Sequence, residues 1–208
     1  MNVVEIVRGI FPAKTKDFVT AVDEHSIILV KELRDKEATD EIDRIAKVIE
    51  ETLNTETNSK VYISSGTVVG DLKDVSRSYK EAKMALEVGK IFETDKYIVN
   101  YEKLGIGRLI YQLPLPLCRM FIKEVLHGLT MDDFDDETLA TVNKFFENNL
   151  NVSETSRQLY IHRNTLVYRL DKLQKMTGLD LRNFDDAIIF KITLMVSKYM
   201  MYMDKMAY

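Results

Sequence analysis

The sequence predicts an α+β domain followed by an all-α domain, and three observations carry this prediction. Short β-rich runs alternate with helical patterns as far as Tyr101, and two of these runs are separated by a polar turn typical of a hairpin. Beyond Leu104 no convincing strand pattern is present. Near the C-terminus, two helical patterns follow each other closely enough to form a helix-turn-helix.

The first domain opens with a short helix over 2–11, which Pro12 ends. Two β-rich runs follow at 18–22 and 27–33, with the polar tetrad "DEHS" between them. Because polar residues favour tight turns between strands, this arrangement predicts a β-hairpin.

A longer helix is predicted next, with Thr39 or Asp40 as its N-cap and a third strand over 60–66 behind it. Its apolar residues recur at spacings of three and four: Ile42, Ile45, Ile49 and Leu53. Another helix over 71–90 follows, and Gly89 is its expected C′ residue. Its predicted apolar stripe is Leu72, Val75, Tyr79, Ala82 and Leu86.

With a fourth strand over 97–100, these elements predict a sandwich in which helices pack on a mixed or antiparallel sheet. Pro114 and Pro116 break the helical run that follows, and the acidic stretch 130–138 is typical of a connector between domains. The predicted division is an α+β domain over 1–103, a helical connector over 104–136 and a helix-turn-helix domain over 137–208.

Composition narrows the possible functions. The 208 residues are 46% hydrophobic and 30% charged, and Cys118 is the only cysteine, which excludes an internal disulfide. No apolar run approaches the roughly 20 residues that span a bilayer, so a cytoplasmic protein is expected, with no membrane partner. A net charge of −4 argues against a chain that coats nucleic acid indiscriminately, although a local basic face remains compatible with it.

The segment 151–183 is predicted to hold the helix-turn-helix, with helices over 152–159 and 163–176 joined by a turn at 160–162. Asn151 is the expected N-cap of the first helix, and Glu154 is expected to complete an arrangement like a capping box. The buried side is predicted to comprise Ser156, Leu159, Ile161, Leu166, Leu170 and Leu173. The segment carries six basic and three acidic residues, a local charge of about +3.

The buried stripe determines which side chains of the second helix face outward. Arginine can bind guanine, asparagine can bind adenine and threonine can contact the thymine methyl, so this helix suits the major groove of DNA. The residues expected to read bases are Arg163, Asn164, Thr165 and Tyr168. Those expected to support them through phosphate or turn contacts are Arg169, Lys172 and His162. A solvated helical hairpin without a DNA function is the plainer alternative.

The motifs "HRNTL-x-YRL" (162–170) and "TGLDLRN" (177–183) resemble the C-terminal helix-turn-helix of the PucR/CdaR-like bacterial transcription factors, which regulate purine and sugar-diacid catabolism. The resemblance implies a sequence-specific DNA-binding regulator. Val167 departs from it, because the family usually carries arginine there, so one phosphate contact is expected to be missing.

Residues 17–101 resemble the GGDEF-like domain of the same family, most specifically in "VYISSGTVVGDLKDVSRSYKEAKMALEVGK" (61–90). An active cyclase needs a Gly-Gly-(Asp/Glu)-Glu-Phe hairpin, whereas the corresponding hairpin here reads "AVDEHSI" and has no glycine. The expectation is therefore a degenerate domain that is no enzyme and uses no cofactor or metal. Asp23 and Glu24 are acidic, but polar residues are usual in hairpin turns.

The family's GGDEF-like domain opens with a strand that is not visible before Asn2, and full-length regulators carry an effector-sensing domain upstream. The expectation is therefore a fragment of an effector-responsive regulator, whose small-molecule effector is bound by a domain that is absent here. Helix-turn-helix proteins usually bind two half-sites on DNA, so a homodimer is expected. The alternatives are a nucleotide-sensing α+β domain and a helical hairpin that binds protein. The apolar segment 184–203 is expected to be a core helix, with a dimer contact as the alternative.

Overall fold

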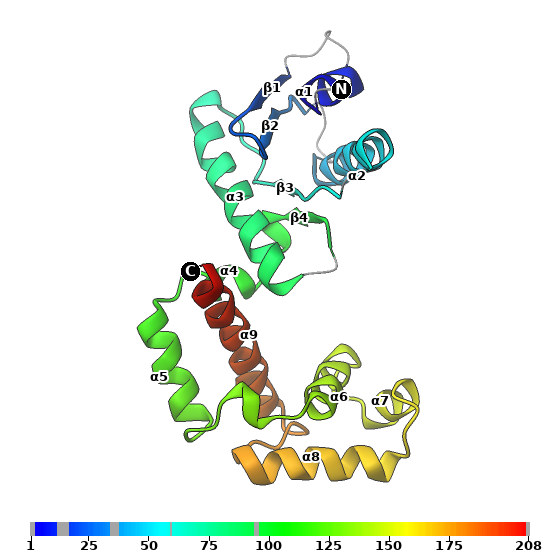
Figure 1. Ribbon diagram of the computed structural model, residues 1–208, viewed down its shortest axis with the longest axis vertical. Coiled ribbons are helices and arrows are strands. Elements are labelled where there is room, and N and C mark those ends of the chain that lie inside the picture. The colour runs from blue at the N-terminus through cyan, green and yellow to red at the C-terminus, as the bar shows by residue number, and fades with distance from the viewer. Residues whose placement is uncertain (1–2, 12–16, 34–37, 59, 94–95, 207–208) are drawn as a thin grey trace. The chain divides into compact units, whose positions relative to one another are not determined.

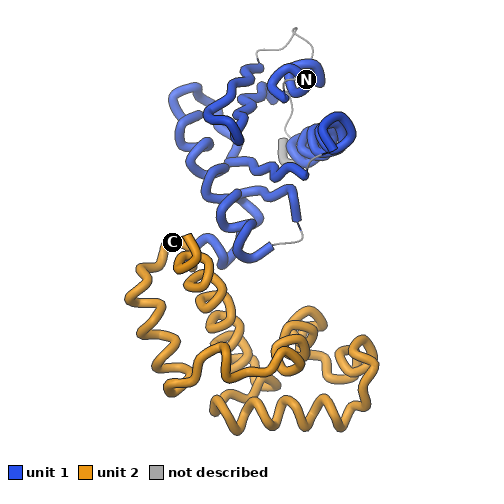
Figure 2. Tube along the Cα trace, in the orientation of Figure 1, with its two compact units in different colours: residues 1–109 blue, residues 110–208 orange. Residues whose placement is uncertain are grey.

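The computed structural model describes residues 3–11, 17–33, 38–58, 60–93 and 96–206. They form two compact units, Met1–Leu109 and Ile110–Tyr208 (Figure 2). The expected end of the first helix at Pro12 lies outside the described residues, and so does the side chain of Thr39. The three-part division with a separate connector stays a prediction.

The first unit contains every described strand (Figure 1). Its elements are α1 (Val3–Ile10), β1 (Phe18–Ala21), β2 (Ile27–Val30), α2 (Ala38–Thr57), β3 (Ile63–Ser65), the 3₁₀ turn η1 (Leu72–Asp74), α3 (Val75–Phe92), β4 (Ile98–Asn100) and the 3₁₀ turn η2 (Tyr101–Lys103). The predicted elements of this unit are all present, and the α+β class is confirmed.

The strands form two separate pairs and not the single sheet that the sequence suggested. β1 and β2 make the predicted antiparallel hairpin, in which Phe18 lies opposite Val30. β3 and β4 are parallel, with Ile63 opposite Ile98, and α3 connects them. A parallel pair requires such a crossover, because the chain must return to the same end of the sheet before the second strand begins.

A hydrophobic core joins the hairpin to the helices of this unit. Its buried members are Ile6, Val7, Val19, Ile49 and Leu53. Ile45 is partly buried against them, so the stripe predicted for α2 is confirmed in part. α2 begins at Ala38, which places Thr39 and Asp40 inside its first turn. Neither residue is therefore the N-cap, and that prediction was wrong.

Gly89 lies inside α3 and does not end it, which corrects the prediction of a C′ residue. The predicted stripe is also wrong in part, because Leu72 is 86% exposed and lies in η1. The buried residues of α3 are Ala85, Val88, Gly89 and Ile91. A Cβ atom on Gly89 would lie 2.6 Å from Cγ2 of Val99, so the absence of a side chain lets α3 approach β4 closely.

The Gly89→Ala variant is therefore expected to unfold at a lower denaturant concentration than the wild type. Overpacking costs about 1–3 kcal/mol, whereas alanine gains at most about 1 kcal/mol over glycine in a helix. Gly9 in α1 is a matched control, since a Cβ there meets no atom within 4 Å and Gly9→Ala is expected to stabilise. Urea unfolding followed by circular dichroism measures both. A stabilised Gly89→Ala variant would contradict the close approach.

The described residues of the second unit form helices and the turns between them, and the unit begins within α4. Its elements are α4 (Gly107–Ile110), α5 (Leu115–Val125), the 3₁₀ turn η3 (Met131–Asp133), α6 (Asp136–Glu147), α7 (Val152–Gln158), α8 (Arg163–Thr177) and α9 (Phe184–Met206). Pro114 is the N-cap of α5, so the predicted break in the helical run is confirmed at this residue. Pro116 lies within the first turn of α5, where proline is tolerated, so it does not break the helix. None of the described helices is both long and apolar enough to cross a membrane.

One core cluster holds α6, α8 and α9 together in this unit. Its buried members are Leu126, Phe134, Val142, Phe145, Leu166, Leu170, Leu173, Leu181 and Phe190. The rings of Phe134 and Phe190 meet edge to face, with centroids 5.9 Å apart. The acidic stretch therefore contributes a core residue, Phe134.

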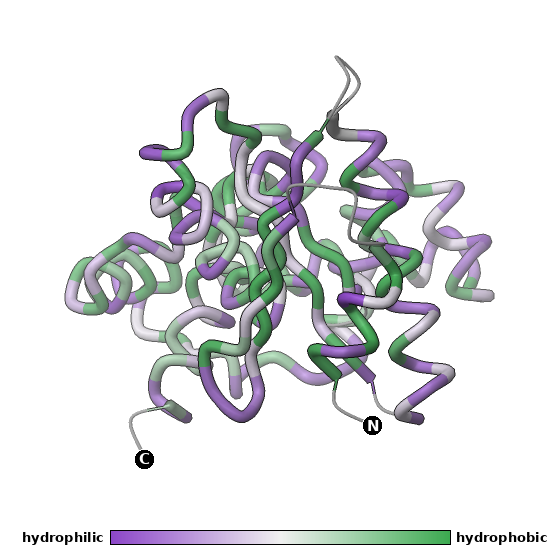
Figure 3. The backbone as a smooth tube through the Cα atoms, turned by 90° about the horizontal axis from the view of Figure 1, so that it is seen from above, coloured by the Kyte–Doolittle hydropathy of each residue, from purple (hydrophilic) through white to green (hydrophobic). Residues whose placement is uncertain are grey.

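Figure 3 shows hydrophobic and hydrophilic residues interspersed along the helical segments. Phe190 and Val196 are buried, which confirms that α9 contributes to the core, whereas Phe184 and Met201 of the same helix are exposed.

Candidate nucleic-acid interface

The predicted helix-turn-helix is present as α7, a turn and α8. Asn151 caps α7, because its Oδ1 accepts a hydrogen bond from the backbone N–H of Glu154 at 3.0 Å. The predicted capping-box arrangement is wrong. The N–H of Asn151 donates to the carbonyl of Asn148, and the carboxylate of Glu154 accepts from Arg157 and Gln158 instead.

The turn between the helices is fixed by backbone hydrogen bonds and by His162. The N–H of Ile161 donates to the carbonyl of Ser156 at 3.0 Å. His162 is the N-cap of α8, and its Nδ1 accepts from the N–H of Asn164 at 3.2 Å. His162 therefore has the turn role predicted for it. Leu159 and Ile161 pack on the core, which confirms the predicted corner.

Tyr160 occupies the left-handed region in this turn, with φ of +53°, and 96% of the residue is exposed. This backbone conformation costs a residue with a Cβ atom about 1–2 kcal/mol, and glycine avoids that cost. Tyr160→Gly is therefore expected to raise the free energy of unfolding by up to about 1 kcal/mol. Tyr168→Gly, within α8, is the control and is expected to lower it by about 0.5 kcal/mol. Thermal melting measures both, and a destabilised Tyr160→Gly variant would show that the tyrosine ring stabilises the turn.

The outward face of α8 is as the sequence predicted. The side chains of Asn164, Thr165 and Lys175 are exposed, and Tyr168 is 69% exposed. Leu166, Leu170 and Leu173 lie on the opposite side at 0–1% exposure. Arg163, in the first turn of α8, donates from Nη1 to Oγ of Ser153 at 3.1 Å. That contact joins the start of α8 to the first turn of α7.

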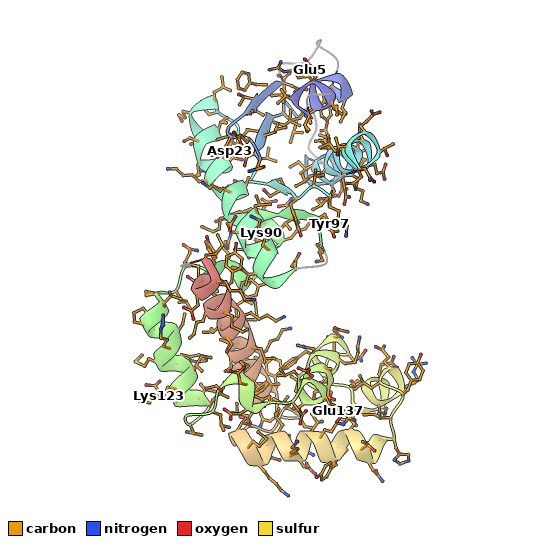
Figure 4. The ribbon with its side chains drawn as sticks, in the orientation of Figure 1. Glu5, Asp23, Lys90, Tyr97, Lys123 and Glu137 are labelled. Carbon is orange, nitrogen blue, oxygen red and sulfur yellow. The ribbon has the colours of Figure 1, made fainter. Side chains whose placement is uncertain are left out.

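Arg169 and Lys172 contact carboxylates of α6, which the sequence reasoning missed. Arg169 donates from Nη1 to Oγ1 of Thr141 at 3.0 Å and from Nη2 to the carboxylate of Glu137. Nζ of Lys172 lies 3.0 Å from Oδ2 of Asp135. Figure 4 marks Glu137 on α6, which packs against α8. The acidic stretch 130–138 was the signal for these partners, but it was interpreted as a connector.

The Asp135 carboxylate has two roles at this contact. Oδ1 caps α6 by accepting from the N–H of Thr138 at 2.7 Å, and Oδ2 accepts from Lys172. Hydrogen bonds from Thr138 and then from Lys172 hold the pKa of Asp135 far below its usual range. The hydrogen bond to Asp135 raises the pKa of Lys172. Both groups are therefore charged throughout the neutral pH range.

Most of the local positive charge of 151–183 is paired within the protein. Arg157 pairs with Glu154, and Arg182 pairs with Asp180 and Asp171. Within the described part of the chain, two of the six basic residues of the segment have no carboxylate partner in salt-bridge range: Arg163 and Lys175. The charge available to a polyanion is thus concentrated on α8.

The β1–β2 turn of the first unit carries two acidic side chains. Asp23 and Glu24 are exposed in the β1–β2 turn, and Oδ1 of Asp23 accepts from the N–H of His25 at 2.8 Å (Figure 4). This hydrogen bond lowers the pKa of Asp23. Among the described residues, no three His, Cys, Asp or Glu side chains gather in a group that could hold a metal ion.

Two family models match separate segments of the chain. Residues 138–196 match the PucR C-terminal helix-turn-helix domain, and residues 2–88 match the GGDEF-like domain. The purine catabolism regulatory protein of Bacillus subtilis is 28% identical over 128 residues, which are 61% of this chain and 24% of that protein. The carbohydrate diacid regulator of Escherichia coli is 31% identical over 136 residues, which are 65% of this chain and 35% of that protein. The DNA-binding transcriptional activator AdeR of B. subtilis is 31% identical over 153 residues, which are 69% of this chain and 34% of that protein. The chain thus spans about a quarter to a third of the length of these relatives.

Proposed function

Because the chain belongs to the PucR/CdaR-like transcriptional regulators, we propose that it binds specific double-stranded DNA sites and regulates catabolic genes through α8. The observation that carries this proposal is the exposed face of α8, where polar side chains lie opposite a fully buried leucine stripe. Such a helix can enter the major groove while its other side stays in the core.

Four residues are proposed to read bases: Arg163, Asn164, Thr165 and Tyr168. Arg163 and Asn164 suit bidentate hydrogen bonds to guanine and adenine, and Thr165 suits the methyl group of thymine. The cap by His162 and the contact of Arg163 with Ser153 support this assignment, because both fix the first turn of α8 before DNA arrives. A preorganised helix loses less conformational entropy on binding.

Phosphate contacts are proposed to come from Lys172, with Lys175 beside it on the exposed face. The side chain of Lys172 is 47% exposed, and exposed ion pairs with carboxylates contribute little to stability. Lys172 can therefore exchange Asp135 for a DNA phosphate. Each phosphate neutralised in this way releases counterions, so the affinity for DNA should depend on salt.

The regulator is proposed to act as a homodimer, because one helix-turn-helix reads only a half-site. The small-molecule effector is proposed to bind in a part of the full-length protein outside the two domains described here. The GGDEF-like domain is proposed to have no catalytic activity, since its hairpin reads "AVDEHSI". A cytoplasmic location fits a protein that acts on the chromosome.

A fluorescence-anisotropy titration with duplexes from the chain's own genomic neighbourhood tests this function. We expect tight binding to one duplex and a steep decrease of log K with log salt, measured at two salt concentrations. Unrelated duplexes of the same length should bind more weakly. Absence of binding at low salt, by a chain that is a dimer in sedimentation, would reject DNA as the partner.

A further inference from the structure

We propose that Arg169 is a positioning residue, which holds α8 at a fixed rotation on α6 and makes no contact with DNA phosphate. This inference rests on the proposed function, because it concerns the helix that reads DNA. It changes the role expected from the sequence, where Arg169 and Lys172 were grouped together as phosphate contacts.

The guanidinium of Arg169 is already occupied by two acceptors on α6. Nη1 donates to Oγ1 of Thr141 at 3.0 Å, and Nη2 donates to the carboxylate of Glu137. Thr141 is 1% exposed, so this acceptor belongs to the core and not to a surface that DNA could displace. Releasing Arg169 to a phosphate would leave the buried Thr141 oxygen without this donor, whereas water could replace the donor at the exposed carboxylate of Glu137.

Burial separates Arg169 from its neighbour Lys172 one turn later. The side chain of Arg169 is 17% exposed, whereas that of Lys172 is 47% exposed. Lys172 has one partner on the surface, and Arg169 has two partners on one helix. A phosphate can therefore reach Lys172 without disturbing α6, but reaching Arg169 would require the α6–α8 contact to open.

The contact between α6 and α8 fixes the rotation of α8 about its axis more tightly than the leucine stripe does. Leu166, Leu170 and Leu173 hold α8 in the core, but hydrophobic burial is non-directional. The two donor groups of Arg169 have a rigid fork geometry, so they fix the rotation of α8 relative to α6. A small rotation would move Asn164 and Tyr168 away from the base edges that they read, since binding geometry must hold to about 0.5 Å.

The two roles predict different effects on binding. Non-specific binding depends on charge, and each lost phosphate contact lowers the slope of log K against log salt by about 0.9. A positioning residue instead affects only the preference for the cognate duplex over an unrelated one. The specificity ratio and the salt slope therefore separate positioning from phosphate contact.

The test uses the full chain and four variants: Arg169→Met, Glu137→Gln, the double variant of these two, and Lys172→Met. Methionine keeps most of the apolar stem of arginine. A substitution of Glu137 should change the stability little, because its side chain is 69% exposed. Anisotropy titrations on the cognate and an unrelated duplex at two salt concentrations give the specificity ratio and the slope. Circular dichroism at the titration temperature confirms that each variant is folded.

We expect Arg169→Met to lower the specificity ratio about tenfold with an unchanged salt slope. Glu137→Gln should lower the ratio less, because the glutamine amide oxygen can still accept a neutral hydrogen bond and Arg169 keeps its contact with Thr141. The double variant should be no worse than Arg169→Met alone, because Glu137 acts through Arg169. Lys172→Met should instead lower the slope by about 0.9 and leave the ratio unchanged.

Two results would overturn the inference. A slope lowered by about 0.9 in Arg169→Met, together with tighter binding of all duplexes by Glu137→Gln, would make Arg169 a phosphate contact. Unchanged binding in both variants would make the contact irrelevant to DNA. A wild-type chain without any cognate preference would reject the proposed function itself, which is a different outcome from either of these.

Discussion

The Asn164→Ala variant is expected to bind its cognate duplex about 5- to 150-fold more weakly than the wild type, while its binding to unrelated duplexes stays the same. Asn164 is exposed in the first turn of α8, where its side-chain amide can make two hydrogen bonds to one adenine. Losing such a pair costs about 1–3 kcal/mol of discrimination, which corresponds to this range of affinities. Anisotropy titrations on both duplexes measure the effect.

Asn143→Ala is the matched control for this variant, because Asn143 is an exposed asparagine of α6 in the same unit. It is expected to bind both duplexes as the wild type does. An Asn164→Ala variant that lost affinity equally for all duplexes would place Asn164 among the groups that position the protein, and not among those that read bases.

The Leu170→Ala variant is expected to lower the free energy of unfolding of the second unit by about 2–5 kcal/mol. Leu170 is 1% exposed and lies in the core cluster that α6, α8 and α9 share. Alanine leaves a cavity there, because the surrounding side chains can fill it only in part. Since small domains are stable by about 5–15 kcal/mol, this loss is a large fraction of the stability of the unit.

Urea unfolding followed by circular dichroism measures this loss. Leu117→Ala is the matched control, because Leu117 lies in the same unit and is 42% exposed. It is expected to change the stability much less. Equal effects of the two substitutions would mean that the leucine stripe of α8 does not form the main core of the unit.

The helix-turn-helix was predictable because its information is local. Leu166, Leu170 and Leu173 recur at helical spacing, and this stripe indicates that Asn164 and Tyr168 lie on the outward face. The cap by Asn151 could likewise be predicted from the residue type and its place before a helical pattern. Each of these features depends on residues within one or two turns.

Contacts between distant residues could not be predicted in this way. Arg169 contacts Glu137 across 32 positions, and the acidic stretch 130–138 by itself does not indicate which basic residue each of its carboxylates will pair with. The prediction that Gly89 ends its helix was wrong, because a glycine late in a helical pattern usually marks the end of the helix. Here Gly89 faces Val99 instead. The pairing of β3 with β4 is a similar case, since strand pairing depends on the course of the chain between the strands.

The single cysteine offers a way to follow the motions of the second unit. Cys118 lies on α5 at 1% exposure, α5 packs against α9, and burial raises the pKa of its thiol. Because the thiolate is the reactive form, a thiol-reactive dye can modify Cys118 only when α5 separates from the rest of the unit. With no other cysteine in the sequence, the labelling rate reports the frequency of this local opening directly, without any substitution in the protein.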